Sequence, residues 1–110
     1  MKIIKIAWLL LILTGSLLIK NNDLFAGEKI KVVATTSTLA SLIREVVKEK
    51  ADVSFIASPH RDVHFISPTP KDVLKVRKAG VFIYAGLDLE IWRKPLVDAA
   101  GRRDFMSGEK

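Results

Sequence analysis

The sequence predicts an α/β fold built on a three-stranded parallel sheet in the order 2-1-3. Three apolar runs of strand length, 30–34, 51–57 and 81–84, alternate with two stretches that have helical periodicity. Such alternation is typical of βαβ units, in which a helix crosses from one parallel strand to the next. Right-handed crossovers in this order place the ends of the first and third strands beside a topological switch point, where ligands of open α/β sheets collect.

The first 26 residues predict a secretory signal peptide. Two lysines stand among the first five residues, residues 6–19 are almost wholly apolar, and Ala26 offers a small residue to signal peptidase. The alternative is an uncleaved membrane anchor, but a spanning helix needs about 20 apolar residues. The polar residues 20–23 end this run early. We therefore expect an exported protein, periplasmic or otherwise outside the cytoplasmic membrane.

The absence of cysteine and the mild basicity narrow the class of protein further. A chain without cysteine can form no disulfide and has no residue for a lipid anchor, so we expect neither. The net charge of +6 falls to about +4 without the leader, because Lys2, Lys5, Lys20 and Asp23 together carry +2. Nucleic-acid binding requires basic residues gathered on one face. Here they are scattered among acidic residues, so we expect no nucleic-acid partner.

Residues 27–101 are expected to form one small α/β domain. Thr36 and Ser37 can cap a first helix over 39–50, in which one side is expected to pack through the apolar residues Leu39, Leu42, Ile43, Val46 and Val47. A second strand and a long loop, 58–68, follow. Thr69, Pro70 and Asp72 then form a strong helix start, with Asp72 placed for a capping box.

The last part of this domain is expected to contain the third strand and a final helix. Gly80 ends the second helix, the third strand follows, and residues 89–100 have helical spacing interrupted by Pro95. We expect a short helix with a kink or restart there, ending at Gly101. Residues 102–110 lack periodicity and predict an irregular polar tail.

His64 is the candidate site residue, because it lies on the loop at the carboxyl edge of the predicted sheet. Taken alone, a loop histidine is more often structural or solvent-exposed than a metal ligand. His60 is expected to be exposed. Structural roles account for three carboxylates, Asp72 as a helix cap and Asp88 and Glu90 as first-turn acids favoured by the helix dipole. We assign no ligand role to Asp62 either, and we expect Trp92 to belong to the core.

Four motifs follow one another along the chain. They are an opening strand and turn at 32–37, His-x-x-x-Pro at His64 and Pro68, Pro-[Ser/Thr]-Pro-x-Asp at 68–72, and a segment ending in Glu-x-Trp at 84–92. Together they resemble one family, the cluster A-I solute-binding proteins, which are extracytoplasmic zinc and manganese receptors of ABC importers. The chain departs from the family at Val63, where proline commonly precedes the histidine.

This resemblance implies that residues 27–101 are a partial α/β lobe, the incomplete amino-terminal lobe of a two-lobed metal receptor. It implies Zn²⁺ or Mn²⁺ as the transported ligand, His64 as the first metal ligand, and an ABC permease in the cytoplasmic membrane as partner. The alternative is a truncated or degenerate exported piece that binds no metal, because one histidine cannot define a zinc site. An enzyme is not expected, since the chain has no Gly-x-Ser-x-Gly, no Gly-rich phosphate loop and no His-Glu-x-x-His.

Overall fold

The computed structural model describes residues 3–4 and 27–106 of the chain. The predicted signal peptide therefore lies almost entirely outside the described residues, and its boundary at Ala26 stays a prediction. Among the helices that the structure does describe, none combines the length and the hydropathy needed to span a bilayer.

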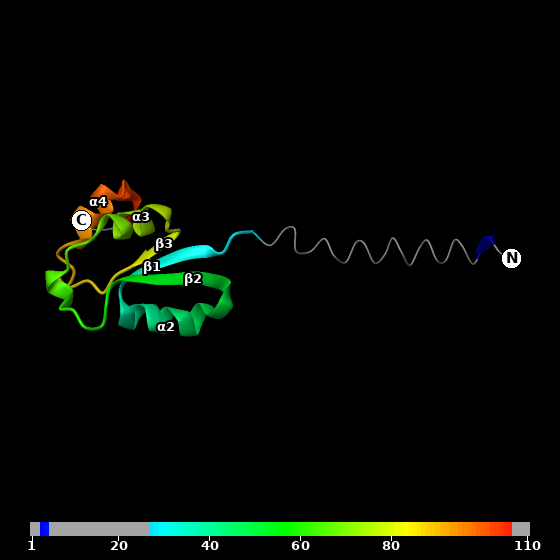
Figure 1. The fold of residues 1–110 in the computed structure, drawn as a ribbon, viewed down its shortest axis with the longest axis horizontal. Coiled ribbons are helices and arrows are strands. Elements are labelled where there is room, and N and C mark those ends of the chain that lie inside the picture. The colour runs from blue at the N-terminus through cyan, green and yellow to red at the C-terminus, as the bar shows by residue number, and fades with distance from the viewer. Residues whose placement is uncertain (1–2, 5–26, 107–110) are drawn as a thin grey trace.

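The sheet has three parallel strands in the order β2-β1-β3, as predicted. They are β1 (Ile30–Thr36), β2 (Ala51–Ala57) and β3 (Val81–Ile83). In the central strand, Val33 lies opposite Ser54 of β2 and Phe82 of β3. Figure 1 shows α2 on one face of this sheet and α3 and α4 on the other, so the molecule has three layers.

Helix α2 (Ser37–Val47) joins β1 to β2 and is followed by the 3₁₀ turn Lys48–Lys50. Its cap is the predicted one, because the Thr36 hydroxyl accepts a hydrogen bond from the Leu39 N–H at 3.3 Å. The predicted packing face is partly wrong. Leu42 and Val46 are exposed, whereas the other three predicted residues, Leu39, Ile43 and Val47, are half-buried. The fully buried residue of the helix is Ala40, which the prediction left out. The small side chain of Ala40 lets this side of the helix lie close to the sheet.

Helix α3 (Pro70–Lys78) joins β2 to β3 and begins with the capping box that the sequence predicts. The Asp72 carboxylate accepts from the Thr69 backbone N–H at 2.9 Å, and the Thr69 hydroxyl accepts from the Asp72 N–H at 3.4 Å. Lys75 lies beside the same carboxylate, at 3.2 Å. Side-chain contacts therefore stabilise the start of this helix in addition to its backbone hydrogen bonds.

Helix α4 (Arg93–Ala99) begins later than the predicted stretch 89–100. Pro95 falls in its first turn, where a missing N–H costs no hydrogen bond, so the expected kink or restart is wrong. The residues before it form a turn in which Leu87 and Asp88 both adopt positive φ. That backbone cannot continue as a right-handed helix.

The prediction of an irregular polar tail over residues 102–110 is wrong for the first half of that segment. Residues Arg103–Met106 form the 3₁₀ helix η4, and Phe105 and Met106 pack against the core. The guanidinium of Arg102 donates to the carbonyls of Ala79, at 2.5 Å, and Arg77, at 3.2 Å. These contacts attach the segment to the end of α3. Residues 107–110 lie outside the described part of the chain.

The main core lies between the sheet and the layer formed by α3 and α4. Its members are Val33, Ala57, Ile66, Val76, Ala79, Phe82, Trp92, Leu96, Val97 and Ala100. Burying such apolar side chains is the main force that holds the layers together. Because Ile66 and Trp92 belong to this core, it reaches the loop that carries His64.

Candidate metal-binding site

The loop between β2 and α3 is ordered by one short turn at the carboxyl edge of the sheet. The 3₁₀ turn η3 (Val63–Phe65) has Asp62 at its amino end, and the Asp62 carboxylate accepts from the His64 backbone N–H at 2.9 Å. This is the usual way in which an aspartate caps a turn. It fixes the backbone that carries the imidazole.

The same Asp62 oxygen also lies 2.9 Å from Nδ1 of His64. A carboxylate can only accept, so this contact favours the tautomer with its proton on Nδ1 and a lone pair on Nε2. Both hydrogen bonds from His64, first the backbone one and then the ring one, hold the pKa of Asp62 below its usual range. The carboxylate therefore stays ionised as an acceptor while Nε2 can bind a metal.

The side chain of His64 is 47% exposed, so the ring is open to solvent ligands. Phe65 lies beside it, with ring centroids 6.3 Å apart, and is itself exposed. A metal ligand must be reachable and oriented, and both conditions hold for this ring.

Trp92 contacts the loop from the core side through a hydrogen bond. Its indole N–H donates to the Val63 carbonyl at 2.5 Å, and its side chain is buried, which confirms its expected place in the core. The tryptophan thus connects the segment before α4 to the residue next to His64. This hydrogen bond holds the backbone at Val63, which immediately precedes His64.

Glu90 has a role that the sequence did not predict. Its buried carboxylate accepts from the Thr35 hydroxyl at 2.5 Å and from the backbone N–H groups of Ala85, at 2.7 Å, and Gly86, at 3.1 Å. The interpretation of Glu90 as a first-turn acid is wrong, because α4 begins only at Arg93. Asp88 is likewise in the preceding turn. Glu90 ties the end of β1 to the turn after β3, at the predicted switch point.

A depression of about 240 Å³ lies at this edge, between the start of α2 and the loop. Thr36, Ser37, Ser58 and Val63 contribute to its walls. His60 is exposed, as expected. Within 27–106, no three side chains of the ligand-forming types His, Cys, Asp and Glu gather closely enough to hold a metal ion. The structure brings Asp62 to His64 and leaves Asp72 and Glu90 in other contacts, while Asp88 lies in the turn before α4.

The comparisons relate this chain to the substrate-binding proteins of metal ABC transporters. It belongs to the family described as zinc-uptake complex component A, periplasmic, whose model matches residues 32–107. This family consists of substrate-binding proteins and not of enzymes, in agreement with our expectation.

Two curated relatives illustrate the match. The manganese ABC transporter substrate-binding lipoprotein PsaA of Streptococcus mitis is 34% identical over 86 residues, which are 74% of this chain and 28% of the relative. The high-affinity zinc uptake system protein ZnuA of Bacillus subtilis is 29% identical over 90 residues, 82% of this chain and 28% of the relative. The chain thus spans little more than a quarter of these relatives. The name lipoprotein conflicts with our expectation of no lipid anchor.

A solved structure supports the fold. The crystal structure of the metal-dependent lipoprotein YcdH from Bacillus subtilis superposes with a TM-score of 0.60 and 28% sequence identity. The match covers 67% of this chain and 28% of that one. The three-stranded sheet with its helices is therefore part of the receptor fold of this family.

Proposed function

We propose that this chain is part of an extracytoplasmic receptor that captures Zn²⁺ or Mn²⁺ for an ABC importer, with His64 as a metal ligand through Nε2. The metal is the transported substrate, and its delivery requires a permease in the cytoplasmic membrane. The observation that carries the proposal is the contact between Asp62 and His64, which favours an exposed imidazole with its lone pair on Nε2. The names of the relatives, one for manganese and one for zinc, support this class of metal.

One imidazole makes a weak site by itself. Structural zinc sites use four protein ligands and catalytic ones three, so affinity falls as ligands are removed. The alternative proposal is an exported α/β piece that holds no metal. It is favoured by the lack of a cluster of three ligand-type side chains in the described region.

The test is Mn²⁺ titration of the full 110-residue chain, followed by ¹⁵N NMR. A bound paramagnetic Mn²⁺ broadens nearby signals, so we expect amides 62–66 to lose intensity first. A parallel titration with Zn²⁺ should shift the imidazole nitrogens of His64. His64→Ala should abolish the broadening of amides 62–66 by Mn²⁺. His60→Ala, which removes a neighbouring exposed imidazole, should leave both the broadening and the Zn²⁺-induced shifts of His64 in place.

Equal effects of the two substitutions, or broadening centred away from the loop, would overturn the assignment of His64. Unchanged spectra at millimolar concentrations of either metal would favour the alternative proposal, an exported α/β piece that binds no metal.

A further inference from the structure

The two edge strands of the sheet differ in length. One edge is β3, with three residues, and the other is β2, with seven. An edge strand presents a row of N–H and C=O groups that can pair with another chain, and a short edge limits such pairing. In the part of the chain that is described, no further strand lies beyond β2. The β2 edge is therefore the longer surface for the addition of a strand.

The register of the sheet identifies which backbone groups of β2 point outward. The Gly80 N–H donates to the Lys31 carbonyl at 2.8 Å, so Lys31 of β1 points toward β3. Successive residues of a strand point their backbone groups to opposite sides, and Val32 therefore points toward β2, where it lies opposite Val53. In a parallel pair, the slanted hydrogen bonds of such a residue go to the two neighbours of its partner. Val53 itself thus points away from β1, and so does Phe55, two residues further on.

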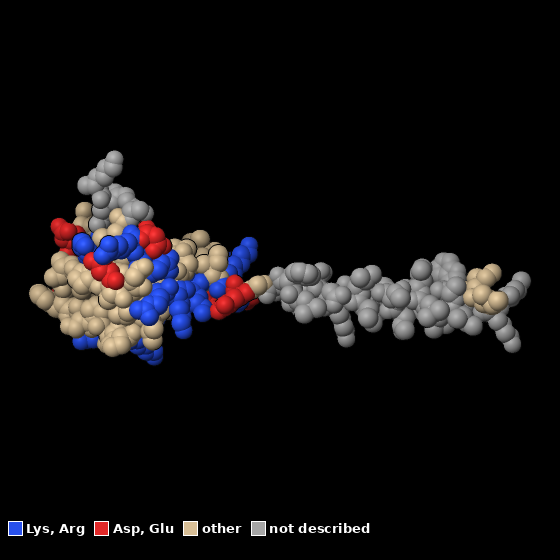
Figure 2. Space-filling view, turned by 90° about the horizontal axis from the view of Figure 1, so that it is seen from above, with Lys and Arg blue, Asp and Glu red and all other residues tan. Residues whose placement is uncertain are grey.

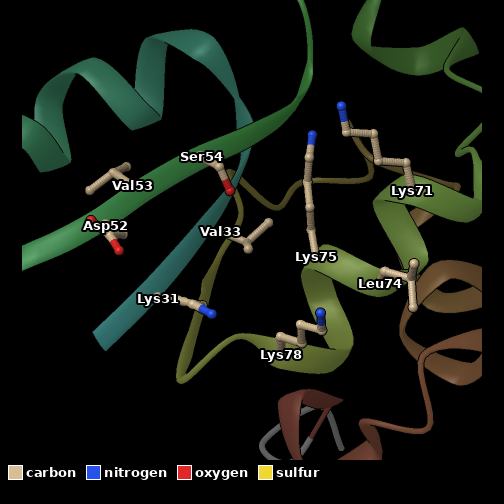
Figure 3. Close-up of a pocket in the computed structure, with 9 residues that line it drawn as sticks. All are labelled: Lys31, Val33, Asp52, Val53, Ser54, Lys71, Leu74, Lys75 and Lys78. Atoms are coloured by element: carbon tan, nitrogen blue, oxygen red, sulfur yellow. The ribbon is translucent and has the colours of Figure 1, made fainter. Parts of the chain in front are cut away.

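Two cations bind these outward carbonyls. The Arg44 guanidinium donates from Nη2 to the Val53 carbonyl at 2.9 Å, and the Lys75 ammonium donates to the Phe55 carbonyl at 3.0 Å. Arg44 belongs to α2 and Lys75 to α3, so the cations reach the edge from opposite faces of the sheet. Figure 3 shows Lys75 extending from α3 toward β2. Hydrogen bonds from charged donors are stronger than neutral ones, and a strand that paired here would have to displace both.

Further basic side chains lie beside this edge. In addition to Lys75, the lysines Lys31, Lys71 and Lys78 line the groove between β2 and α3 (Figure 3). Figure 2, which looks onto the molecule from the side of α3 and α4, shows Lys and Arg gathered over this region. If two copies met edge to edge, each would bring its cations close to those of the other, and like charges repel. The surrounding charge therefore opposes pairing in addition to the two bound carbonyls.

We propose that the β2 edge is a pairing surface for β2 of a second copy of this chain, and that Arg44 and Lys75 keep it closed. Ser54 is the middle residue of β2, so an antiparallel pair about a twofold axis places Ser54 opposite its own counterpart and matches the full length of both edges. In this register, Val53 of each copy would exchange backbone hydrogen bonds with Phe55 of the other. A second copy thus satisfies the outward groups of both strands at once. The proposal does not depend on metal binding, because neither cation belongs to the candidate metal-binding site.

The test uses disulfide formation in the full chain, which has no cysteine of its own. Opposite residues of a non-hydrogen-bonded pair have Cα atoms about 4.5 Å apart, within the range of roughly 4.4–6.8 Å that a disulfide spans. We expect Ser54→Cys to cross-link roughly tenfold faster when Arg44→Met and Lys75→Met are also present, because these changes keep the side-chain length and remove the charged donors. Either change alone should give a smaller increase, so the test does not depend on the doubly changed background.

Two controls separate pairing at β2 from other association. Lys71→Met with Lys78→Met removes the same charge from exposed positions of α3 and should leave the rate within about threefold of that in the unchanged background. Leu42→Cys places the thiol on α2, at a side chain that is 62% exposed, and its cross-linking should not depend on Arg44 or Lys75. Equal rates for Ser54→Cys in all backgrounds would overturn the proposal. A parallel rise for Leu42→Cys would also overturn it, since association would then not use β2.

Discussion

Asp62 acts on His64 through two hydrogen bonds with different consequences. The bond from the backbone N–H shapes the turn, and the contact with Nδ1 selects the ring tautomer and the direction of Nε2. Carboxylates in this position behind a histidine raise its basicity as a ligand and hold its orientation. On this basis Asp62 is a positioning residue for the proposed metal ligand.

Removing the carboxylate should therefore weaken metal binding without removing the ligand. We expect Asp62→Ala to reduce Zn²⁺ affinity by roughly 10–100-fold. The ring ¹⁵N shifts of neutral His64 should also move toward a mixture of tautomers, which a role in the turn alone would not cause. Asp52→Ala removes an exposed carboxylate from β2 and serves as the control. Loss of affinity with an unchanged tautomer would contradict the positioning role.

The residues of this edge differ in how far the sequence could predict them. His64 stands out through its loop and its motif, and Trp92 through its spacing. The partners of Asp62 and Glu90 could not be predicted. The Asp62 contact depends on a turn only three residues long, and that of Glu90 joins residues 55 positions apart. Neither kind of contact leaves a periodic pattern in the sequence.

At the scale of elements, local sequence signals predicted starts better than packing faces. The capping box of α3 is encoded within four residues, so it could be predicted, and the structure confirms it. The packing face of α2 depends on how close the sheet lies, which favours Ala40 over Leu42. The start of α4 depends on positive φ at Leu87 and Asp88, and although Gly86 marks the beginning of this turn, neither of the two following residue types favours that conformation enough to show how far the turn extends.

The capping box should make the stability of α3 depend on pH. Burial raises the pKa of the Asp72 carboxyl, but hydrogen bonds from Thr69 and the ammonium of Lys75 outweigh it and hold the pKa below its ordinary value of 3.8. A lowered pKa means that the stabilisation is complete above the ordinary value and is lost as the pH falls through the folded one. Asp72 should thus stabilise the lobe at neutral pH and cease to do so in acid.

Asp72→Asn mimics the protonated acid and gives the test. At pH 6 the substitution should lower the free energy of unfolding by about 0.5–1 kcal/mol, the size of a cap or a partly exposed ion pair. In urea titrations the difference between the two proteins should shrink as the pH falls below 3.8 and through the lowered pKa of the folded protein. A difference that stays constant from pH 6 to pH 2.5 would show that ionisation of Asp72 contributes nothing.

At the scale of the whole molecule, one core joins the sheet to α3, α4 and η4. Residues from β1, such as Val33, and from α4, such as Leu96 and Val97, belong to the same cluster. Because the layers share one core, they are expected to unfold cooperatively, and a cavity in one layer should destabilise the others as well. The three-stranded sheet is small, and a domain of this size has little stability to spare.

Leu96→Ala should therefore destabilise the entire lobe. The side chain is 2% exposed, and such a truncation costs about 2–5 kcal/mol. Leu42→Ala makes the same change on α2 at a side chain that is 62% exposed and should cost less than about 0.5 kcal/mol. Amide hydrogen exchange is the measurement, and in Leu96→Ala the protection of Val33 in β1 should fall together with that of Val97 in α4. If only α4 lost protection, α4 would unfold independently of the sheet. The packing of Trp92 in the core would then not stabilise the loop that carries His64.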